Sequence, residues 1–470
     1  MRRKDKELPI LEKLSVIDAG AEGKAIARFE NRVVFIPFAA PGDVVDVQVT
    51  LRKSTFMEAK IIKIHEESTV RTKPACRHYG LCGGCRWQHL DYKAQLQYKQ
   101  KQVTDALTRI GHLELPEISP IAGAPATYYY RNKLEYTFSN RKWLTGGPDD
   151  IAPGDRNMNA LGYHLPGMFD RVFDVEDCML QPEPSNQLRL WMRDFAIENE
   201  LTFWDVKIWQ GLLRNFVIRT SNSGDLMVII VFGEDQPEAI HQVMENLTLQ
   251  FPTITSAMWV VNTKRNDVFA DLDIQLFKGE SYIREKMEDL TFRVGPVSFF
   301  QTNARQALTL YKYAREFAAL TGNELVYDLY TGTGTIANFV ARRCHRVVGI
   351  EYVDSAVRDA RINSSVNRIE NTDFIAGDMA KTLDERFILK HGRPQVVITD
   401  PPRAGMHPDV VKRIVEMSPE RVVYISCNPA TQARDIAQMA DQYSIAKVQP
   451  VDMFPQTHHV ENVVLLLRKS

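Results

Sequence analysis

The sequence predicts a multidomain protein with a small N-terminal β-barrel, a mixed α+β central domain and a C-terminal doubly wound α/β domain. Short segments of alternating apolar and polar residues fill positions 8–65, which is typical of small barrels. A group of three cysteines follows, in a chain of 470 residues that has only six. From residue 324 onward, apolar strands alternate with helical segments, the pattern of a doubly wound sheet. We place the domains at residues 1–66, 67–290 and 291–470.

The composition is that of an ordinary globular protein. The net charge is −1, so any surface that binds nucleic acid must be local. The N-terminus lacks the apolar run of a signal peptide, and no apolar stretch is long enough to span a bilayer. We therefore expect a cytoplasmic protein that does not associate with membranes. In that reducing environment clustered cysteines are metal ligands or catalytic thiols rather than disulfides.

The barrel is predicted from strands that alternate with a period of two. "VVFIPF" and "VVDVQV" flank a turn at residues 41–43, and "EAKIIKIHE" continues the same period. The next segment, "CRHYGLCGGC", is the cysteine cluster, and it contributes Cys76, Cys82 and Cys85. Their spacing matches neither common ferredoxin pattern, so the spacing alone favours zinc, with His78 or His89 as a fourth ligand.

A helix is predicted over residues 91–112, ending at Gly111, and it is a candidate to pack on the C-terminal domain. Around it, residues 71–142 carry twelve Lys and Arg against five Asp and Glu, interleaved with aromatic residues. Such a mixture suits RNA, because cations bind phosphates and rings stack on unpaired bases. An ordinary solvated surface is the alternative interpretation.

The C-terminal domain has a glycine-rich turn, "DLYTGTGT", between a strand and a helix. Acidic residues end the following strands at Glu351, Asp378 and Asp400, on the sheet edge where open α/β sheets bind ligands. Some of these acids could instead be helix N-caps. The turn lacks the third glycine of the dinucleotide fingerprint, and "DPP" resembles methyltransferases, so S-adenosylmethionine (SAM) is favoured as the ligand.

Two further residues of this edge have reactive side chains. Cys427, in "YISCNPAT", ends a buried strand just before a helix, whose positive end is expected to lower the thiol pKa. A buried structural cysteine is the alternative. Glu461, in "HHVENVVLLL", enters the last strand from the same edge, where partial burial is expected to raise its pKa and make it a base.

At these residues the sequence resembles the RNA uracil-5-methyltransferase family, in particular its iron–sulfur branch, the bacterial 23S rRNA enzymes. The matching motifs are "FFQTN", "DLYTGTGT", "SCNP" and "HHVE", in the family's order, and the resemblance covers most of the chain. It implies an N-terminal TRAM-type barrel, a central domain with an iron–sulfur cluster and a SAM-dependent methyltransferase domain. Thr331 and Thr335 stand where many relatives have Cys and Asn.

The resemblance also implies roles for individual residues. Cys427 becomes the nucleophile and Glu461 the base, and Arg131 is a contact to the target nucleotide. The implied SAM contacts are Gln301, Tyr330, Glu351, Asp378 and Asp400. The implied ligands of a [4Fe–4S] cluster, with zinc as the alternative metal, are Cys76, Cys82, Cys85 and Cys178.

These assignments predict formation of 5-methyluridine. Thiolate addition to uracil C6 makes C5 nucleophilic toward a methyl group, and a base then removes the C5 proton. The expected partner is 23S rRNA, with tRNA as the alternative, and the expected state is a monomer. Two other hypotheses are an amino-methyltransferase acting on adenine and an RNA-binding or redox module that uses the cluster for electron transfer.

Overall fold

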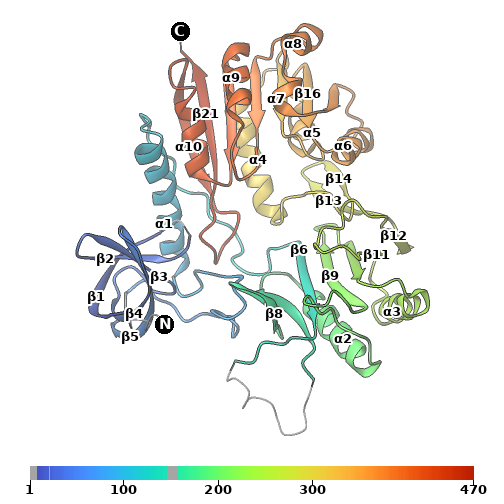
Figure 1. The fold of residues 1–470 in the computed structure, drawn as a ribbon. Coiled ribbons are helices and arrows are strands. Elements are labelled where there is room, and N and C mark those ends of the chain that lie inside the picture. The colour runs from blue at the N-terminus through green and yellow to red at the C-terminus, as the bar shows by residue number, and fades with distance from the viewer. Residues whose placement is uncertain (1–7, 21, 146–156, 470) are drawn as a thin grey trace, which may run out of the picture.

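Figure 1 shows the computed structural model of the chain, which describes residues 8–20, 22–145 and 157–469. A β-barrel, a central mixed sheet and a C-terminal α/β domain follow one another along the sequence. The long helix α1 (Tyr92–Asp105) rises from the barrel and lies beside the C-terminal domain (Figure 1). Within the described ranges, no helix combines the length and the apolar character needed to cross a membrane.

The N-terminal barrel is closed, in the order β1-β2-β3-β5-β4, which confirms the predicted barrel. Its strands are β1 (Ile10–Ala19), β2 (Ala25–Phe29), β3 (Arg32–Ile36), β4 (Val44–Arg52) and β5 (Phe56–Glu66). Alternate residues point inward, as Val45, Val47 and Val49 of β4 do, and form the barrel core. Closure pairs the strands in a ring and leaves no long free edge.

The cysteine segment, residues 67–91, joins the barrel to α1 without a regular helix or strand. It is tied to the barrel by Arg71, whose guanidinium donates to both carboxylate oxygens of Asp43 at 2.8 and 2.7 Å. Asp91 caps α1 by accepting from the Ala94 amide. The expected helix changes character after Asp105, because a π-helical turn over Ala106–Ile110 completes it.

The central sheet has seven strands in the order β12-β11-β10-β9-β6-β7-β8, and only β10 and β11 run parallel. The strands are β6 (Lys133–Ser139), β7 (Ala160–Leu165), β8 (Met168–Asp174), β9 (Leu213–Thr220), β10 (Leu226–Phe232), β11 (Ser256–Val261) and β12 (Gln275–Gly279). Helices α2 (Ser185–Glu198) and α3 (Pro237–Gln250) share a hydrophobic core with it. Strand β10 is buried along its whole length, so both faces of the sheet centre are covered.

A two-stranded hairpin, β13 (Ile283–Met287) and β14 (Leu290–Val294), precedes the C-terminal domain. The C-terminal sheet has the order β17-β16-β15-β18-β19-β21-β20, and β21 alone of these seven strands runs antiparallel to its neighbours. Its strands are β15 (Leu325–Leu329), β16 (Arg346–Glu351), β17 (Thr372–Ala376), β18 (Val396–Thr399), β19 (Arg421–Ser426), β20 (Tyr443–Val451) and β21 (Glu461–Arg468). Its helices are α4 (Ala304–Ala318), α5 (Thr335–Ala341), α6 (Asp354–Val366), α7 (Met379–Thr382), α8 (Glu385–His391), α9 (Pro408–Met417) and α10 (Pro429–Ala437).

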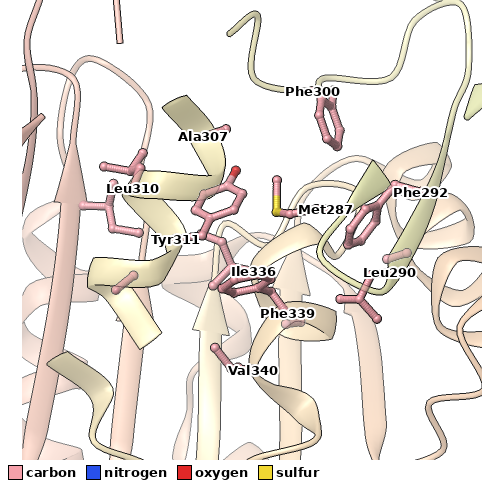
Figure 2. Close-up of a cluster of buried hydrophobic side chains, with 14 of the residues drawn as sticks. Met287, Leu290, Phe292, Phe300, Ala307, Leu310, Tyr311, Ile336, Phe339 and Val340 are labelled. Carbon is pink, nitrogen blue, oxygen red and sulfur yellow. The ribbon is translucent and has the colours of Figure 1, made fainter. Parts of the chain in front are cut away.

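The core of the C-terminal domain continues into the central domain. One hydrophobic cluster contains Met227 and Ile229 of β10 together with Val326 and Ile398 of the C-terminal sheet. Figure 2 shows its part between α4, α5 and the β13–β14 hairpin. This shared core fixes the central sheet against the C-terminal α/β domain. One strand differs from expectation: β17, predicted to be buried, lies at the sheet edge, and of its five residues only Phe374 is fully buried.

Candidate active site

The glycine-rich turn between β15 and α5 is held in a left-handed conformation. Tyr330, Gly332 and Gly334 have φ angles of 61°, 54° and 74°. At Gly334 the packing also requires glycine, because a Cβ there would lie 2.8 Å from the Cβ of Ala360. The turn therefore brings backbone N–H groups to the carboxyl edge of the sheet, next to the start of α5.

Glu351 ends β16 and braces this turn. Its Oε2 accepts from the Gly332 amide at 3.1 Å and its Oε1 from the Val353 amide at 3.0 Å. Each carboxylate oxygen keeps a lone pair for a further donor, such as a ribose hydroxyl. Asp378, in contrast, is the N-cap of α7 and accepts from the Ala380 amide at 3.0 Å, so the helix-cap interpretation applies to it.

Two other carboxyl groups lie at the centre of this edge. Asp328 is fully buried, and its Oδ2 accepts from the Thr331 hydroxyl and from the Ala337 amide. Burial raises its pKa to about 7. Asp400 follows β18, and burial, together with the charge of Asp328, raises its pKa to about 7 as well. Thr331 thus has a structural role, as a donor to Asp328.

Cys427 and Glu461 are neighbours at one end of the sheet. Strands β19 and β21 are antiparallel with Ser426 opposite Asn462, so the next positions outward are Cys427 and Glu461. Glu461 is only 3% exposed, more buried than the sequence suggests. Burial and the nearby Asp400 raise its pKa well above the ordinary value for a glutamate, which makes its carboxylate a strong base.

The expected depression of the Cys427 pKa is wrong. Burial, together with the carboxyl groups of Glu461 and Asp400 and against a lowering by Arg403, raises the pKa of this thiol to about 12. The start of α10 is used by a side chain instead, because Asn428 caps this helix by accepting from the Ala430 amide. In the ligand-free protein, Cys427 is therefore a protonated thiol.

Gln301 contacts Tyr311, which lies near the carboxyl groups of Asp400 and Glu461. Gln301 is 7% exposed, and its backbone oxygen accepts from the Asn132 side chain of the central domain at 3.1 Å. Its amide interacts with the hydroxyl of Tyr311, a buried residue of α4 that also feels the charges of Asp400 and Glu461. In Figure 2 this hydroxyl points away from the apolar α5 residues of the cluster.

The four cysteines of the predicted metal site line one cavity of about 140 Å³, away from Cys427: Cys76, Cys82, Cys85 and Cys178. Burial raises the pKa of Cys85 to about 12, and the neighbouring thiols raise it further. Among the described residues, no group of three or more His, Cys, Asp or Glu side chains is arranged as a site for a single metal ion. The cysteines converge, but without the close spacing of a zinc site, in which each Zn–S bond is about 2.3 Å.

The two histidines considered as zinc ligands are engaged elsewhere. His78 Nε2 accepts from the Glu176 amide at 3.3 Å. His89 bonds to Tyr79 through one ring nitrogen and to the Ala39 carbonyl through the other. Both ring nitrogens of His89 are therefore engaged, whereas His78 lines the cysteine cavity and has its Nδ1 left for the fourth position of a Cys₃His site.

Arg131 lies between this cavity and the catalytic end of the chain. Its guanidinium stands over the ring of Phe454 at 5.5 Å, and its amide donates to Leu180, two residues after Cys178. Its neighbour Tyr130 donates to the Pro455 carbonyl at 2.9 Å. This segment therefore links the cysteine cavity to the loop that leads into Glu461.

Comparison with known proteins identifies the fold and the family. The profile of the tRNA (uracil-5-)-methyltransferase family matches residues 219–469, and the TRAM domain profile matches residues 12–62. A protein of Bacteroides thetaiotaomicron described as an uncharacterized RNA methyltransferase is 54% identical over 451 residues, covering 95% of this chain and 99% of that protein. The chain belongs to the tRNA (uracil-5-)-methyltransferase family.

Two further proteins match nearly the whole length of this chain. An uncharacterized RNA methyltransferase of Porphyromonas gingivalis is 52% identical over 466 residues, covering 97% of this chain and 100% of that protein. The crystal structure of the Pyrococcus abyssi tRNA (uracil-54, C5)-methyltransferase in complex with S-adenosyl-L-homocysteine matches with a TM-score of 0.74 and 27% identity, over 97% of this chain and 100% of that one. The uracil-5-methyltransferase is thus SAM-dependent, with a TRAM barrel and a SAM-methyltransferase domain.

Sequence reasoning missed three residues at this uracil-5-methyltransferase site. Tyr311 matches the apolar face of an amphipathic helix, so nothing marks it as polar and buried. Asp328 is visible in the "DLYTGTGT" motif, but its burial depends on the packing of α5 above it. Arg403 follows "DPP" in the sequence, and that position alone is the signal that could have pointed to it.

Proposed function

We propose that this uracil-5-methyltransferase acts on a uridine of 23S rRNA, with Cys427 as the nucleophile and Glu461 as the base. The register of β19 and β21 is the observation that carries the proposal, because it makes these two side chains neighbours at the strand ends. Asp400 shares their environment, since its charge acts on both. A thiol beside a strongly basic carboxylate is the arrangement that covalent catalysis on a pyrimidine requires.

We assign three steps to the reaction: addition, methyl transfer and elimination. Cys427 Sγ forms a bond to uracil C6, and the electron pair of the C5–C6 double bond moves onto C5 and O4. C5 then takes the methyl group, whose bond to the sulfonium sulfur of SAM breaks, so that S-adenosyl-L-homocysteine leaves with the electron pair of that bond. Glu461 removes the remaining proton from C5, the C5–C6 double bond re-forms, and the bond from Sγ to C6 breaks, which releases 5-methyluridine and the free thiolate.

Because the pKa of the Cys427 thiol is raised, neighbouring groups must also help it to lose its proton. The thiol must lose its proton before or during attack, and Arg403 favours the thiolate. SAM, when bound, supplies the methyl group and the positive charge of its sulfonium. The residues that we assign to holding it are Gln301, Tyr330, Glu351, Asp378 and Asp400. The braced turn and the free lone pairs of Glu351 support this assignment.

We assign the cysteine cavity to a [4Fe–4S] cluster held by Cys76, Cys82, Cys85 and Cys178, because these four cysteines line it together. A cluster takes one thiolate at each of four iron atoms, so it tolerates a wider set of sulfurs than a single zinc ion does. The fourth cysteine is in the cavity wall, and the two candidate histidines have other partners. A cluster there would cross-link a segment that has no regular secondary structure and so stabilise its fold.

The choice between ribosomal and transfer RNA needs an experiment. The Pyrococcus abyssi enzyme acts on tRNA, and its match includes the barrel, so the barrel alone does not distinguish the two targets. The cysteine cavity remains the argument for 23S rRNA. Arg131, between that cavity and the catalytic loop, is the residue that we assign to contact with the target nucleotide.

The test is a methylation assay with two RNAs. Purified protein, with its metal retained, is incubated with methyl-labelled SAM and either unmodified 23S transcript or a tRNA transcript. The proposal expects label at uridine C5 in the 23S transcript alone, and no label with Cys427→Ala. Cys344→Ala, a buried cysteine outside both sites, is the matched control and keeps activity. Label in tRNA alone overturns the target, and label with Cys427→Ala overturns the mechanism.

A further inference from the structure

A cleft of about 450 Å³ lies where the barrel, the cysteine segment and the C-terminal domain meet. The barrel contributes Lys24, Phe38 and one carboxylate, Glu22. The cysteine segment contributes Arg86, and the C-terminal domain contributes Arg403 and His459, so three cations stand against one carboxylate in the wall. Its volume is in the range of small-molecule sites, about 300–1,000 Å³, so it has room for about one nucleotide. Neither Cys427, Glu461 nor any of the residues assigned to SAM lines it, and Arg403 is the residue that it shares with the site described above.

The walls of this cleft are fixed to one another. The amides of Arg86 and Trp87 both donate to the Gln456 carbonyl, at 2.9 and 3.0 Å. The Trp87 indole donates to the Gly23 carbonyl at 3.2 Å. Gly23, at φ +79°, packs so closely that a Cβ would lie 3.0 Å from Nδ1 of His458. The cleft is therefore preformed, which lowers the ordering cost of binding a ligand.

Two of its cations have no anionic partner. Within the described part of the chain, neither Arg86 nor Arg403 forms an ion pair with a carboxylate, whereas Lys24 is paired with Glu58 at 2.7 Å. The Arg403 guanidinium instead contacts Nδ1 of His459 at 3.2 Å. Two unpaired guanidinium groups on different segments around one cleft suit a phosphate group, which arginine binds with paired hydrogen bonds.

Aromatic rings complete the cleft. The rings of His458 and His459 lie with centroids 4.1 Å apart and planes tilted by 40°, and Phe38 packs edge-on against Tyr79 at 5.6 Å. Burial, followed by neighbouring cations, lowers the pKa of His459 to about 4, so its imidazole is neutral at physiological pH. A neutral ring offers a stacking surface and a hydrogen-bonding nitrogen rather than a charge, which suits a nucleobase.

The cleft is continuous with the catalytic site through Arg403. The backbone oxygen of this residue accepts from the Asn428 side chain at 3.1 Å and from the Thr431 hydroxyl at 3.3 Å. Asn428 follows the nucleophile Cys427, and His459 precedes the base Glu461 by two residues. A strand that has one base at Cys427 would therefore reach the cleft with a neighbouring nucleotide.

We propose that this cleft binds the phosphate and the base of a nucleotide next to the target uridine, in single-stranded RNA. The inference rests on the proposed function, since it takes the target base to lie at Cys427. Arg86 and Arg403 bind the phosphate, and Phe38 and His459 stack on the base. The sequence preference of the enzyme then depends partly on a pocket that the barrel helps to build.

The first test measures binding without methyl transfer. The probe is a short fluorescein-labelled single-stranded RNA with one uridine among adenosines, titrated with the full-length protein in the presence of S-adenosyl-L-homocysteine. Arg86→Glu and Arg403→Gln are each expected to raise Kd about tenfold. Loss of one phosphate contact also reduces the slope of log K against log salt by about 0.7.

Arg109→Glu is the matched control. Arg109 is exposed in the same basic segment, outside the cleft, and its charge reversal is expected to change Kd by less than about twofold. Because Arg86 adjoins Cys85, retention of SAM binding by calorimetry shows that each variant is folded. Equal losses for all three variants, or an unchanged Kd for Arg403→Gln, overturn the cleft and indicate diffuse electrostatic binding.

A second test locates the nucleotide. An RNA with 4-thiouridine next to the target uridine is irradiated with the protein, and the cross-linked peptides are mapped by mass spectrometry. Cross-links to the peptides that contain Phe38 or His459 support the cleft, and cross-links elsewhere alone overturn it. Failure of the methylation assay while these binding differences persist would count against the proposed function and leave the cleft as an RNA site.

Discussion

The molecule has two thiol sites that are alike in burial and opposite in surroundings. Burial raises the pKa of Cys427 and of Cys85 alike, to about 12. Around Cys427 stand a basic carboxyl group, Glu461, and a cation, Arg403. Around Cys85 stand the thiols of Cys76, Cys82 and Cys178, each of which acts on its pKa. A lone thiol with a base beside it is suited to transient deprotonation and chemistry, whereas thiols that face one another need a metal to stay deprotonated.

The largest expected effect distinguishes the two thiol sites, because a variant at one site loses methylation activity and a variant at the other loses stability. Cys427→Ala is expected to lower the methylation rate by about 10⁴-fold or more and to leave the urea midpoint unchanged, because only the nucleophile is removed. Cys178→Ser is expected to lower the yield of folded protein and the urea midpoint, because a ligand of the proposed cluster is lost. Methylation rates and urea melts of both variants, with Cys344→Ala as control, check this. A folded, stable Cys178→Ser protein would remove the distinction.

The second-largest expected effect concerns α1, the helix that follows the cysteine segment and packs on the C-terminal domain. Lys99 of α1 and Asp452, after β20, are both fully buried and form an ion pair at 2.5 Å. Lys99→Met leaves the Asp452 carboxylate buried without its partner, which is expected to destabilise the protein by about 3–5 kcal/mol. The double variant Lys99→Met/Asp452→Asn recovers much of that loss. Urea denaturation measures both, and equal stability of the single and double variants contradicts the account.

The smallest expected effect tests the charge around Cys427. Arg403 lowers the pKa of this thiol, so Arg403→Gln raises it and reduces the thiolate fraction at any pH below it. The rate of methylation at saturating RNA, which removes the effect of weaker RNA binding, is expected to rise with pH in both proteins. The variant needs a higher pH for the same rate. Coincident pH profiles would show that Arg403 does not act on the nucleophile.

The sequence predicts the catalytic edge better than the cysteine site, for a physical reason. In a parallel sheet, the strand ends meet at one edge whatever the helices do, so Glu351, Asp400 and Cys427 follow from the strand pattern alone. Cys178 meets the other cysteines through irregular chain, which no periodicity describes. The assignment of that residue depends on family resemblance, and the structure brings it to the same cavity.

The local sequence pattern also gives the wrong prediction where tertiary packing determines strand order, pKa or burial. The strand pattern of β17 does not reveal that it lies at the sheet edge, since strand order is a long-range property. The helix-end argument gives the wrong direction for the pKa of Cys427, because burial and two carboxyl groups outweigh a helix start that Asn428 already caps. Lys99 looks like a surface residue in the sequence and is fully buried, because Asp452 lies 353 positions away along the chain.

The central claim is that Cys427 forms a covalent bond to the RNA and that Glu461 resolves it. Glu461→Gln should allow the thiol to add and the methyl group to transfer, and then stall before the C5 proton is removed. The account predicts a protein–RNA adduct that survives denaturing electrophoresis and carries the methyl label, with no adduct from the double variant Cys427→Ala/Glu461→Gln. An absent adduct for Glu461→Gln, or one that persists in the double variant, would contradict it.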